Sequence, residues 1–137
     1  MSEKMQEQET EIASLSRGGY SAIAAPQMVD EQAVRTLFQA EGAEAARGLV
    51  GTGVAYRHDW GNLKGQVILP LNWSFVKRNS LVFVSIGEGL PGGGKFIGDA
   101  RYTVHNVAMS DGRIDVWVNI EWSYPIRIYV DYLVINP

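Results

Sequence analysis

The sequence predicts a mainly β fold, an antiparallel β-sandwich or flattened barrel of about six to eight strands with one N-terminal helix. From about residue 50, apolar and polar side chains alternate with a period of two, which is typical of half-buried strands. Gly, Pro and Asn interrupt these runs at short intervals. A chain of 137 residues with 46% hydrophobic residues is also long enough to bury a core without metals or disulfides.

Composition excludes several classes of function. The chain has no cysteine, which excludes a disulfide scaffold, thiol catalysis and cysteine-ligated metal sites. Its net charge is −3 and its Lys and Arg residues are scattered, so no nucleic-acid partner is expected. No apolar run reaches the roughly 18–20 residues of a membrane span. The first residues lack the pattern of a classical signal peptide, so we expect a cytoplasmic chain or one released without such a signal.

Two regions are predicted along the chain. Residues 1–27 are rich in Glu, Gln and Ser and then in Gly, so we expect a mobile polar arm and linker. Residues 28–137 are expected to form a single β domain that starts with the helix.

The stretch "VDEQAVRTLFQAEGAEAARG" is the one predicted helix. Asp30 is a suitable N-cap, and Gly48 is a suitable stop. Between them Val34, Leu37 and Phe38 recur at helical spacing. The apolar stripe is short, so this helix is expected to lie on a sheet or to close one end of a barrel.

The predicted strands follow in order. Pro70 cannot donate a ladder hydrogen bond, so its strand is expected to be an edge strand or to carry a bulge. The strand candidates are "GVAYRHDW", "GQVILPLNWSFV", "SLVFVSIG", "KFIGDARYTVHNVAM", "RIDVWVNIEW" and "IRIYVDYLVI".

The last three strands allow a prediction of register. A three-residue loop over 110–112, with Gly112 in the left-handed region, keeps the apolar residues of the first hairpin on one face. A second three-residue loop over 123–125 does the same for the next hairpin. Three adjacent antiparallel strands are therefore expected, in the order of the chain.

This register defines two faces. One face is apolar and is expected to join the core, whereas the other is polar and aromatic. On the polar face a ladder of alternating charge is expected across the strands, formed by Arg101, Glu121 and Arg127. Around it the register gathers the candidate ligand-binding residues His105, Trp117, Asn119, Tyr129 and Asp131.

Aromatic rings beside hydrogen-bonding groups are typical of sites for sugars and similar ligands. We therefore expect a lectin-like, non-enzymatic binding or assembly module whose ligand is a saccharide or a similar small polar molecule. A merely solvated polar face is an open alternative. So is a small cofactor-free barrel enzyme of the cyclase or isomerase type, with an enclosed cavity in place of an open face. A structural self-assembling protein is a third possibility.

Self-association is expected from the last strand, since Leu133 and Ile135 make it apolar on both faces near its end. A homo-oligomer, or a cover over that end of the strand, would account for them.

No catalytic residue, cofactor or metal ligand is assigned from the sequence. "GEGLPGGGKF" satisfies the spacing of a phosphate-binding loop, but Phe96 stands where Ser or Thr is needed and a strand follows in place of a helix. It is read as a Gly-rich loop that can act as a lid over a site. His58 and His105 have too few neighbouring donors in the sequence for a metal site.

Overall fold

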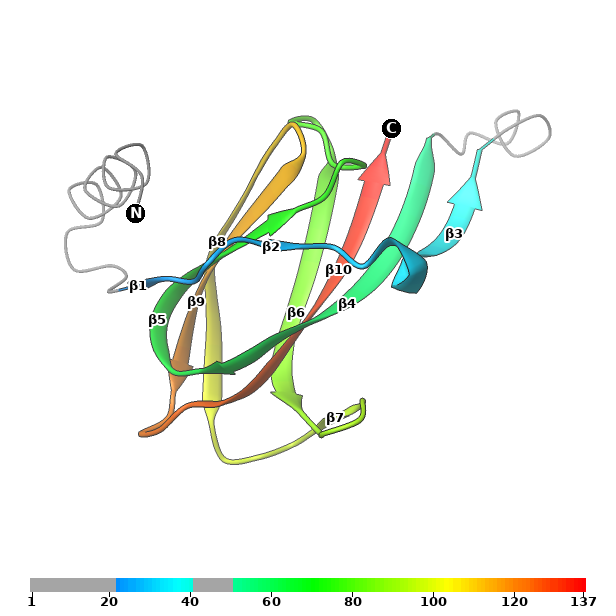
Figure 1. Cartoon of the computed structure of the whole chain (residues 1–137). Coiled ribbons are helices and arrows are strands. Elements are labelled where there is room, and N and C mark those ends of the chain that lie inside the picture. The colour runs from blue at the N-terminus through cyan, green and yellow to red at the C-terminus, as the bar shows by residue number, and fades with distance from the viewer. Residues whose placement is uncertain (1–21, 41–50) are drawn as a thin grey trace.

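The computed structural model describes residues 22–40 and 51–137. Their backbone forms two β-sheets and one short 3-10 helix, so the predicted mainly β, antiparallel class is confirmed (Figure 1). In chain order the elements are β1 (Ala22–Ile23), β2 (Gln27–Met28), η1 (Glu31–Ala33), β3 (Arg35–Gln39), β4 (Thr52–Leu63), β5 (Gly65–Asn72), β6 (Leu81–Gly89), β7 (Lys95–Phe96), β8 (Arg101–Ser110), β9 (Arg113–Glu121) and β10 (Ile126–Asn136).

The strands divide into two sheets. Sheet A has the order β1-β5-β9-β8, with β2 also pairing with β5, and sheet B has the order β3-β4-β10-β6-β7. All pairings are antiparallel except those of β1 and β2 with β5. Only Lys64 separates β4 from β5, so the chain passes from sheet B to sheet A at this corner. Gly65 makes the corner with a φ of 74°, which glycine adopts without strain.

The core lies between the two sheets and follows the predicted alternation. In β9, the apolar residues at every second position, from Ile114 to Ile120, are buried, and the residues between them are half-buried. In β10 the same holds from Ile126 to Val134, and Tyr129 is buried in addition. The residues most completely buried include Leu69, Leu71, Trp73, Val76, Val116, Val118, Ile128 and Val130.

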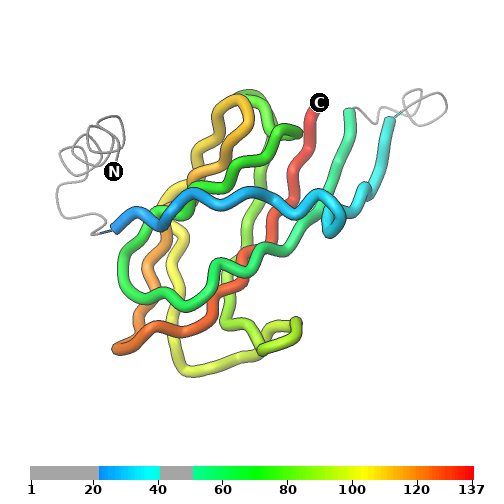
Figure 2. The backbone as a smooth tube through the Cα atoms, in the orientation of Figure 1, coloured from blue at the N-terminus to red at the C-terminus, as the bar shows by residue number. Residues whose placement is uncertain are grey.

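Residues 22–27, which were expected to be part of a linker, join sheet A together with Met28. β1 and β2 lie beside β5 in parallel, and Val29 donates a backbone hydrogen bond to the carbonyl of Asn72. The chain then crosses to sheet B, where β3 forms the edge (Figure 2). This segment therefore connects the two sheets along one side of the fold.

The predicted helix does not form over residues 29–40; its remainder, 41–48, lies outside the described residues. Asp30 does act as an N-cap, but for η1, where its side chain accepts from the N–H of Gln32 at 3.1 Å. β3 follows and pairs with β4. The Phe38 ring packs over Gly53 of β4, where a Cβ would lie only 2.3 Å from a ring carbon. Pairing with a long neighbouring strand thus outweighs the weak helical pattern.

The β8–β9 hairpin combines two registers. Its turn has two residues, Asp111 and Gly112, so the predicted three-residue loop is wrong, although Gly112 has the expected positive φ of 82°. A bulge between Val104 and Asn106 then shifts the pairing by one residue. Beyond the bulge the predicted register holds, with Arg101 opposite Glu121. The bulge keeps apolar residues inward on both sides of it.

The predicted hairpin between β9 and β10 is wrong. β9 lies in sheet A between β5 and β8, whereas β10 lies in sheet B between β4 and β6. The segment 122–125 therefore crosses from one sheet to the other. Since β10 has neighbours on both sides, its apolar residues on both faces belong to a central strand of the sheet.

The prediction for Pro70 is also corrected. β5 is an interior strand, and its pairing with β9 shows no register shift. On the other side, β1 pairs at Val67 and Ile68 and β2 pairs at Leu71 and Asn72, so the ladder is interrupted opposite Pro70. This gap accommodates the missing N–H.

Candidate functional site

The predicted ligand-binding residues fall on two different sheets. His105, Trp117 and Asn119 lie on β8 and β9 of sheet A, whereas Tyr129 and Asp131 lie on β10 of sheet B. The common surface expected for these five residues is therefore wrong. The charge ladder is divided in the same way: Arg101 and Glu121 face each other in sheet A, and Arg127 forms an ion pair with Asp59 in sheet B.

On sheet A, the Trp117 ring is already in contact with other side chains. His105 stacks on it, with ring centroids 4.5 Å apart and an interplanar angle of 29°. The indole N–H of Trp117 donates to Oε1 of Gln66 at 2.8 Å. A ligand that used Trp117 as a stacking platform would compete with His105 for one face of the ring.

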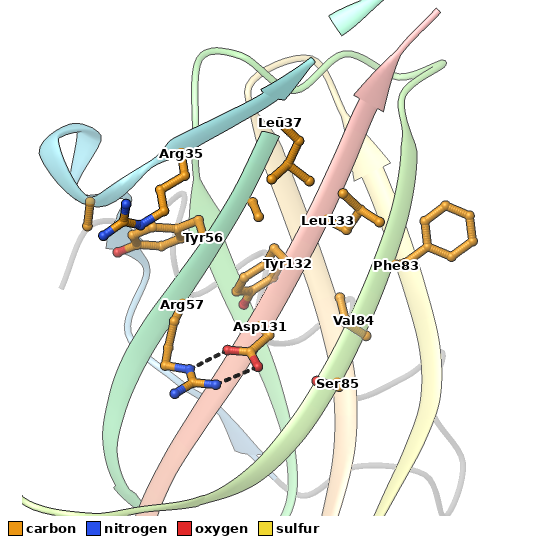
Figure 3. A pocket seen from close by; sticks show the side chains of 12 residues that line it. Arg35, Leu37, Tyr56, Arg57, Phe83, Val84, Ser85, Asp131, Tyr132 and Leu133 are labelled. Atoms are coloured by element: carbon orange, nitrogen blue, oxygen red, sulfur yellow. Dashed lines mark hydrogen bonds and ion pairs between the residues drawn. The ribbon is translucent and has the colours of Figure 1, made fainter. Parts of the chain in front are cut away.

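Sheet B carries an open groove of about 650 Å³ (Figure 3). One cross-strand row runs through it, in which Arg35, Ala55, Leu133 and Phe83 lie opposite one another on β3, β4, β10 and β6. Leu37 of β3 also lines the groove. The side chains of Leu37 and Phe83 are both 57% exposed, so the apolar part of the groove is accessible to solvent.

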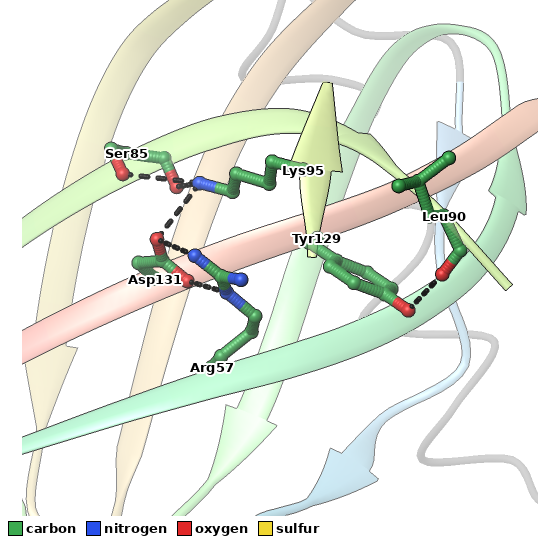
Figure 4. A network of polar contacts seen from close by, with 6 residues as sticks. All are labelled: Arg57, Ser85, Leu90, Lys95, Tyr129 and Asp131. Atoms are coloured by element: carbon green, nitrogen blue, oxygen red, sulfur yellow. Dashed lines mark hydrogen bonds and ion pairs between the residues drawn. The ribbon is translucent and has the colours of Figure 1, made fainter. Parts of the chain in front are cut away.

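The next cross-strand row is polar and centres on Asp131 (Figure 4). Nε and Nη2 of Arg57 donate to the two carboxylate oxygens of Asp131 at 2.6 and 3.0 Å. Nζ of Lys95 donates to Oδ2 of Asp131 at 2.9 Å and to the hydroxyl oxygen of Ser85 at 3.3 Å. The groove thus ends at a carboxylate shared by two cations.

These contacts set the ionisation of the polar row. Partial burial raises the pKa of Asp131, but the hydrogen bonds from Arg57 and Lys95 outweigh this effect and leave the pKa below its ordinary value. The hydrogen bond to Asp131 in turn raises the pKa of Arg57. Both groups are therefore charged at neutral pH.

Tyr129 fixes the Gly-rich loop to the end of the polar row. Its hydroxyl donates to the carbonyl of Leu90 at 2.7 Å, and its ring lies against Gly89. A Cβ at Gly89 would lie 2.5 Å from a ring carbon, so this close approach requires glycine. The guanidinium of Arg57 lies 5.9 Å from the centre of the Tyr129 ring.

A second polar group, centred on His58, is buried beneath β2 and η1. The N–H of Asp30 donates to the Tyr56 hydroxyl at 3.0 Å, and that hydroxyl lies 2.6 Å from Nδ1 of His58. Nε2 of His58 lies 2.7 Å from Oε1 of Gln27. All of these hydrogen bonds form if the Tyr56 hydroxyl donates to Nδ1 of His58 and the N–H at Nε2 donates to Gln27. This arrangement requires the neutral imidazole. Burial lowers the pKa of His58, in agreement with this form.

The described residues offer no obvious place for a metal ion. Within residues 22–40 and 51–137, no group of three or more His, Asp or Glu side chains is close enough to hold one. In the same part of the chain, no helix is long and apolar enough to cross a membrane.

Sequence reasoning missed four residues of the groove and its polar end, which are Arg35, Arg57, Phe83 and Lys95. They come from β3, β4, β6 and β7, strands that the sequence did not place beside β10. The one available signal was the apolar character of both faces of β10, which is typical of a strand with neighbours on both sides.

Comparison with known proteins adds no relative to this geometry. The chain matches no protein-family model, no curated protein and no solved structure.

Proposed function

We propose that this chain is a non-enzymatic binding module whose sheet B groove holds a small amphipathic anion. The ligand would lay an apolar body on Leu133 and Phe83 and direct an anionic group toward Arg35 and Arg57. The observation that carries the proposal is that two neighbouring cross-strand rows place these four side chains on one face of sheet B.

Charge supports an anion over a neutral or cationic ligand. Two arginines, Arg35 and Arg57, line the groove with a single carboxylate, Asp131, which Lys95 also contacts. The Arg35 side chain forms no ion pair or hydrogen bond with any described residue, so none of them occupies its donors. Guanidinium groups suit carboxylate and similar anions because they can donate two parallel hydrogen bonds.

The same features favour binding over catalysis. The groove is open to solvent, whereas the enzyme alternative calls for an enclosed cavity. Asp131 is held ionised by its two cationic partners, and a carboxylate with a lowered pKa is a weak general base at neutral pH. Arg57 is likewise a poor proton donor.

Two expectations from the sequence stay predictions. The saccharide ligand was expected on a surface that combined Trp117 with Tyr129, and the groove is a different surface. Self-association was expected from the last strand, through Leu133 and Ile135. Leu133 lines the groove, so association through this face would bring the arginines of two copies together, which opposes it. A bound small anion would instead relieve this excess of positive charge.

Naphthoate and its uncharged analogue naphthamide test the proposal by isothermal titration calorimetry. Naphthoate should bind with the higher affinity. Arg35→Gln should lower the affinity for naphthoate by about tenfold, because a charge-assisted hydrogen bond contributes about 1.5–3 kcal/mol, and should leave the affinity for naphthamide unchanged. Phe83→Ser should lower the affinity for both ligands. Arg101→Gln, an exposed arginine of sheet A, is the matched control and should change neither.

Light scattering during the same titration separates binding from assembly. A constant mass with saturable naphthoate binding supports the proposal. If naphthoate does not saturate, or if Arg35→Gln and Arg101→Gln have equal effects, the proposal is wrong. A mass that rises with concentration and falls in Phe83→Ser would identify the face as a self-association surface instead.

A further inference from the structure

A second hollow lies where the ends of β6 and β8 approach each other. It has a volume of about 370 Å³ and is lined by residues that include Ile86, Phe96, Ile97, Gly98 and Tyr102. Phe96 is the last residue of the Gly-rich loop that the sequence suggested as a lid. Ile97 and Gly98 follow it, in a segment that was predicted to be part of a strand and is not one. The Ile97 side chain is fully exposed, so it makes little contact with the rest of the protein.

Beside this hollow, the Tyr102 hydroxyl is buried and has no partner among the described residues. Its oxygen is sealed from solvent and has no hydrogen bond within the described part of the chain. An unpaired buried hydroxyl costs about 1–3 kcal/mol, and nearly all such groups in native proteins have a partner. A ligand that pairs with this hydroxyl would recover the cost.

The Glu88 side chain lies close to the same hollow, and no described residue pairs with it. It lies opposite Ile128 in the β6–β10 ladder, and Ile128 is fully buried, so Glu88 faces the interior side of sheet B. A Cβ at Gly98 would lie 2.7 Å from Oε1 of Glu88, which places the carboxylate against the loop that lines the hollow. Its side chain forms no ion pair or hydrogen bond within residues 22–40 and 51–137. Burial raises the pKa of the Tyr102 hydroxyl, and the negative charge of Glu88 raises it further, in agreement with the proximity of the two groups.

Lys95, a cation that lines the hollow, does not neutralise this carboxylate. The methylene groups of Lys95 pass over Gly87, where a Cβ would lie 3.1 Å from Cδ. Its ammonium group is bound by Asp131 at 2.9 Å on the outer side of sheet B. Lys95 is one of the residues that line the hollow, but its charge is used in the polar row of the groove.

We propose that this hollow is a second binding site, independent of the groove, for a small primary amine with a flat apolar body. The ammonium group would donate hydrogen bonds to the Glu88 carboxylate and the Tyr102 hydroxyl oxygen. The apolar body would pack against Ile86 and Phe96. Because no solvent reaches the hydroxyl oxygen, the segment around Gly98 must move aside on binding. The positive φ angles of Gly92, Gly93 and Gly94 give the preceding loop a backbone that other residues rarely adopt.

Phenethylamine and its uncharged analogue phenethyl alcohol test this site in the full chain by calorimetry and NMR titration. Phenethylamine should bind saturably and more tightly than the alcohol. Glu88→Gln should lower the amine affinity by about tenfold, because a charged hydrogen bond is lost, and should leave the alcohol affinity unchanged. Glu121→Gln, an exposed carboxylate of β9, is the matched control and should leave both affinities unchanged.

The Tyr102→Phe substitution is a second test of the site and does not depend on Glu88. This substitution should lower the affinity for phenethylamine several-fold. It should keep or raise the Tm, because it removes a buried hydroxyl that has no partner among the described residues. The proposal is overturned if phenethylamine does not saturate or if Glu88→Gln and Glu121→Gln act alike. It is also overturned if Tyr102→Phe lowers the Tm without weakening the amine, which would show that an internal water already pairs with the hydroxyl. None of these outcomes depends on naphthoate binding in the groove.

Discussion

His58 is a buried histidine whose two nitrogens both have partners, Tyr56 on one side and Gln27 on the other. A protonated imidazole would present two donors, and the Tyr56 hydroxyl could then no longer donate to Nδ1. The contacts between β4 and the segment that connects the two sheets therefore favour the neutral form of His58. The side chains of His58 and Gln27 stabilise the fold and are not among the residues that line the groove.

The stability of the protein should depend on pH through His58. Its pKa is below the ordinary value of 6.5, so the unfolded chain binds the extra proton between these two pKa values. The free energy of unfolding should therefore fall as the pH drops below 6.5, by up to about 1.4 kcal/mol per pH unit, and level off below the folded-state pKa. Urea unfolding measured from about pH 8 to about pH 5 checks this.

Matched variants isolate the contribution of His58. His58→Gln should remove most of the slope, whereas His105→Gln, at the other histidine of the chain, should keep it. Asp131 acts in a separate window, because its lowered pKa makes stability fall only as the pH drops below its ordinary 3.8. An unchanged slope in His58→Gln would contradict the prediction.

β3 is the element in which the sequence was most misleading. Val34, Leu37 and Phe38 have helical spacing, yet residues 35–39 form an edge strand on β4. A single short apolar stripe does not distinguish a helix from a strand, and the deciding contacts lie in β4, where Gly53 leaves room for the Phe38 ring. A sequence pattern read locally contains no information on that neighbour.

The contact between Phe38 and Gly53 gives a test of the β3 pairing. Gly53→Ala would place a Cβ 2.3 Å from the Phe38 ring, so the ring must move, at a cost of about 1–3 kcal/mol in the free energy of unfolding. In a Phe38→Ala background the same substitution should cost much less. A double-mutant cycle by urea unfolding measures this coupling, and strictly additive losses would refute the packing described for β3.

The long strands β4, β6 and β9 were predicted well because each alternates over a long stretch, whereas the predicted strand over residues 95–109 is interrupted between β7 and β8. β9 and β10 follow the expected faces, and the limits of β4, β6 and β9 fall within a few residues of the predicted runs. What failed was the choice of neighbours. The connection over residues 123–125 is short enough for a hairpin, but it joins two sheets, and nothing within those residues distinguishes the two cases.

The candidate site shows the same limit. Arg101 and Glu121 were placed correctly because one hairpin determines them. Asp131 and Tyr129 were assigned the wrong neighbours, since their partners Arg57, Lys95 and Leu90 come from strands and a loop much earlier in the chain. Long-range pairing of this kind depends on the packing of the two sheets and not on local spacing.

The two sheets are held together by an apolar core to which both contribute, and burial should decide the effect of otherwise equal substitutions. Leu69 is completely buried between the sheets, whereas Leu81 is 50% exposed on the outer side of β6. Leu69→Ala should lower the free energy of unfolding by about 2–5 kcal/mol. Leu81→Ala should change it by no more than about 0.5 kcal/mol.

Urea denaturation of these two variants checks the arrangement of the layers. A large loss in Leu81→Ala would mean that the outer face of β6 is covered in solution. That result would also favour self-association over the small-ligand proposal. A small loss in Leu69→Ala would instead contradict the position of β5 at the centre of sheet A.

The central place of β10 in sheet B has a consequence for biosynthesis. β10 follows β4 and β6 in the chain but lies between them, so a ribosome releases both of its neighbours before the strand that joins them exists. Until then β4 and β6 each expose an unsatisfied edge, and such edges promote aggregation of nascent chains. Sheet A, by contrast, is fully synthesised once β9 has emerged. The protein is thus expected to mature in two stages, with a vulnerable interval that ends only with its last strand.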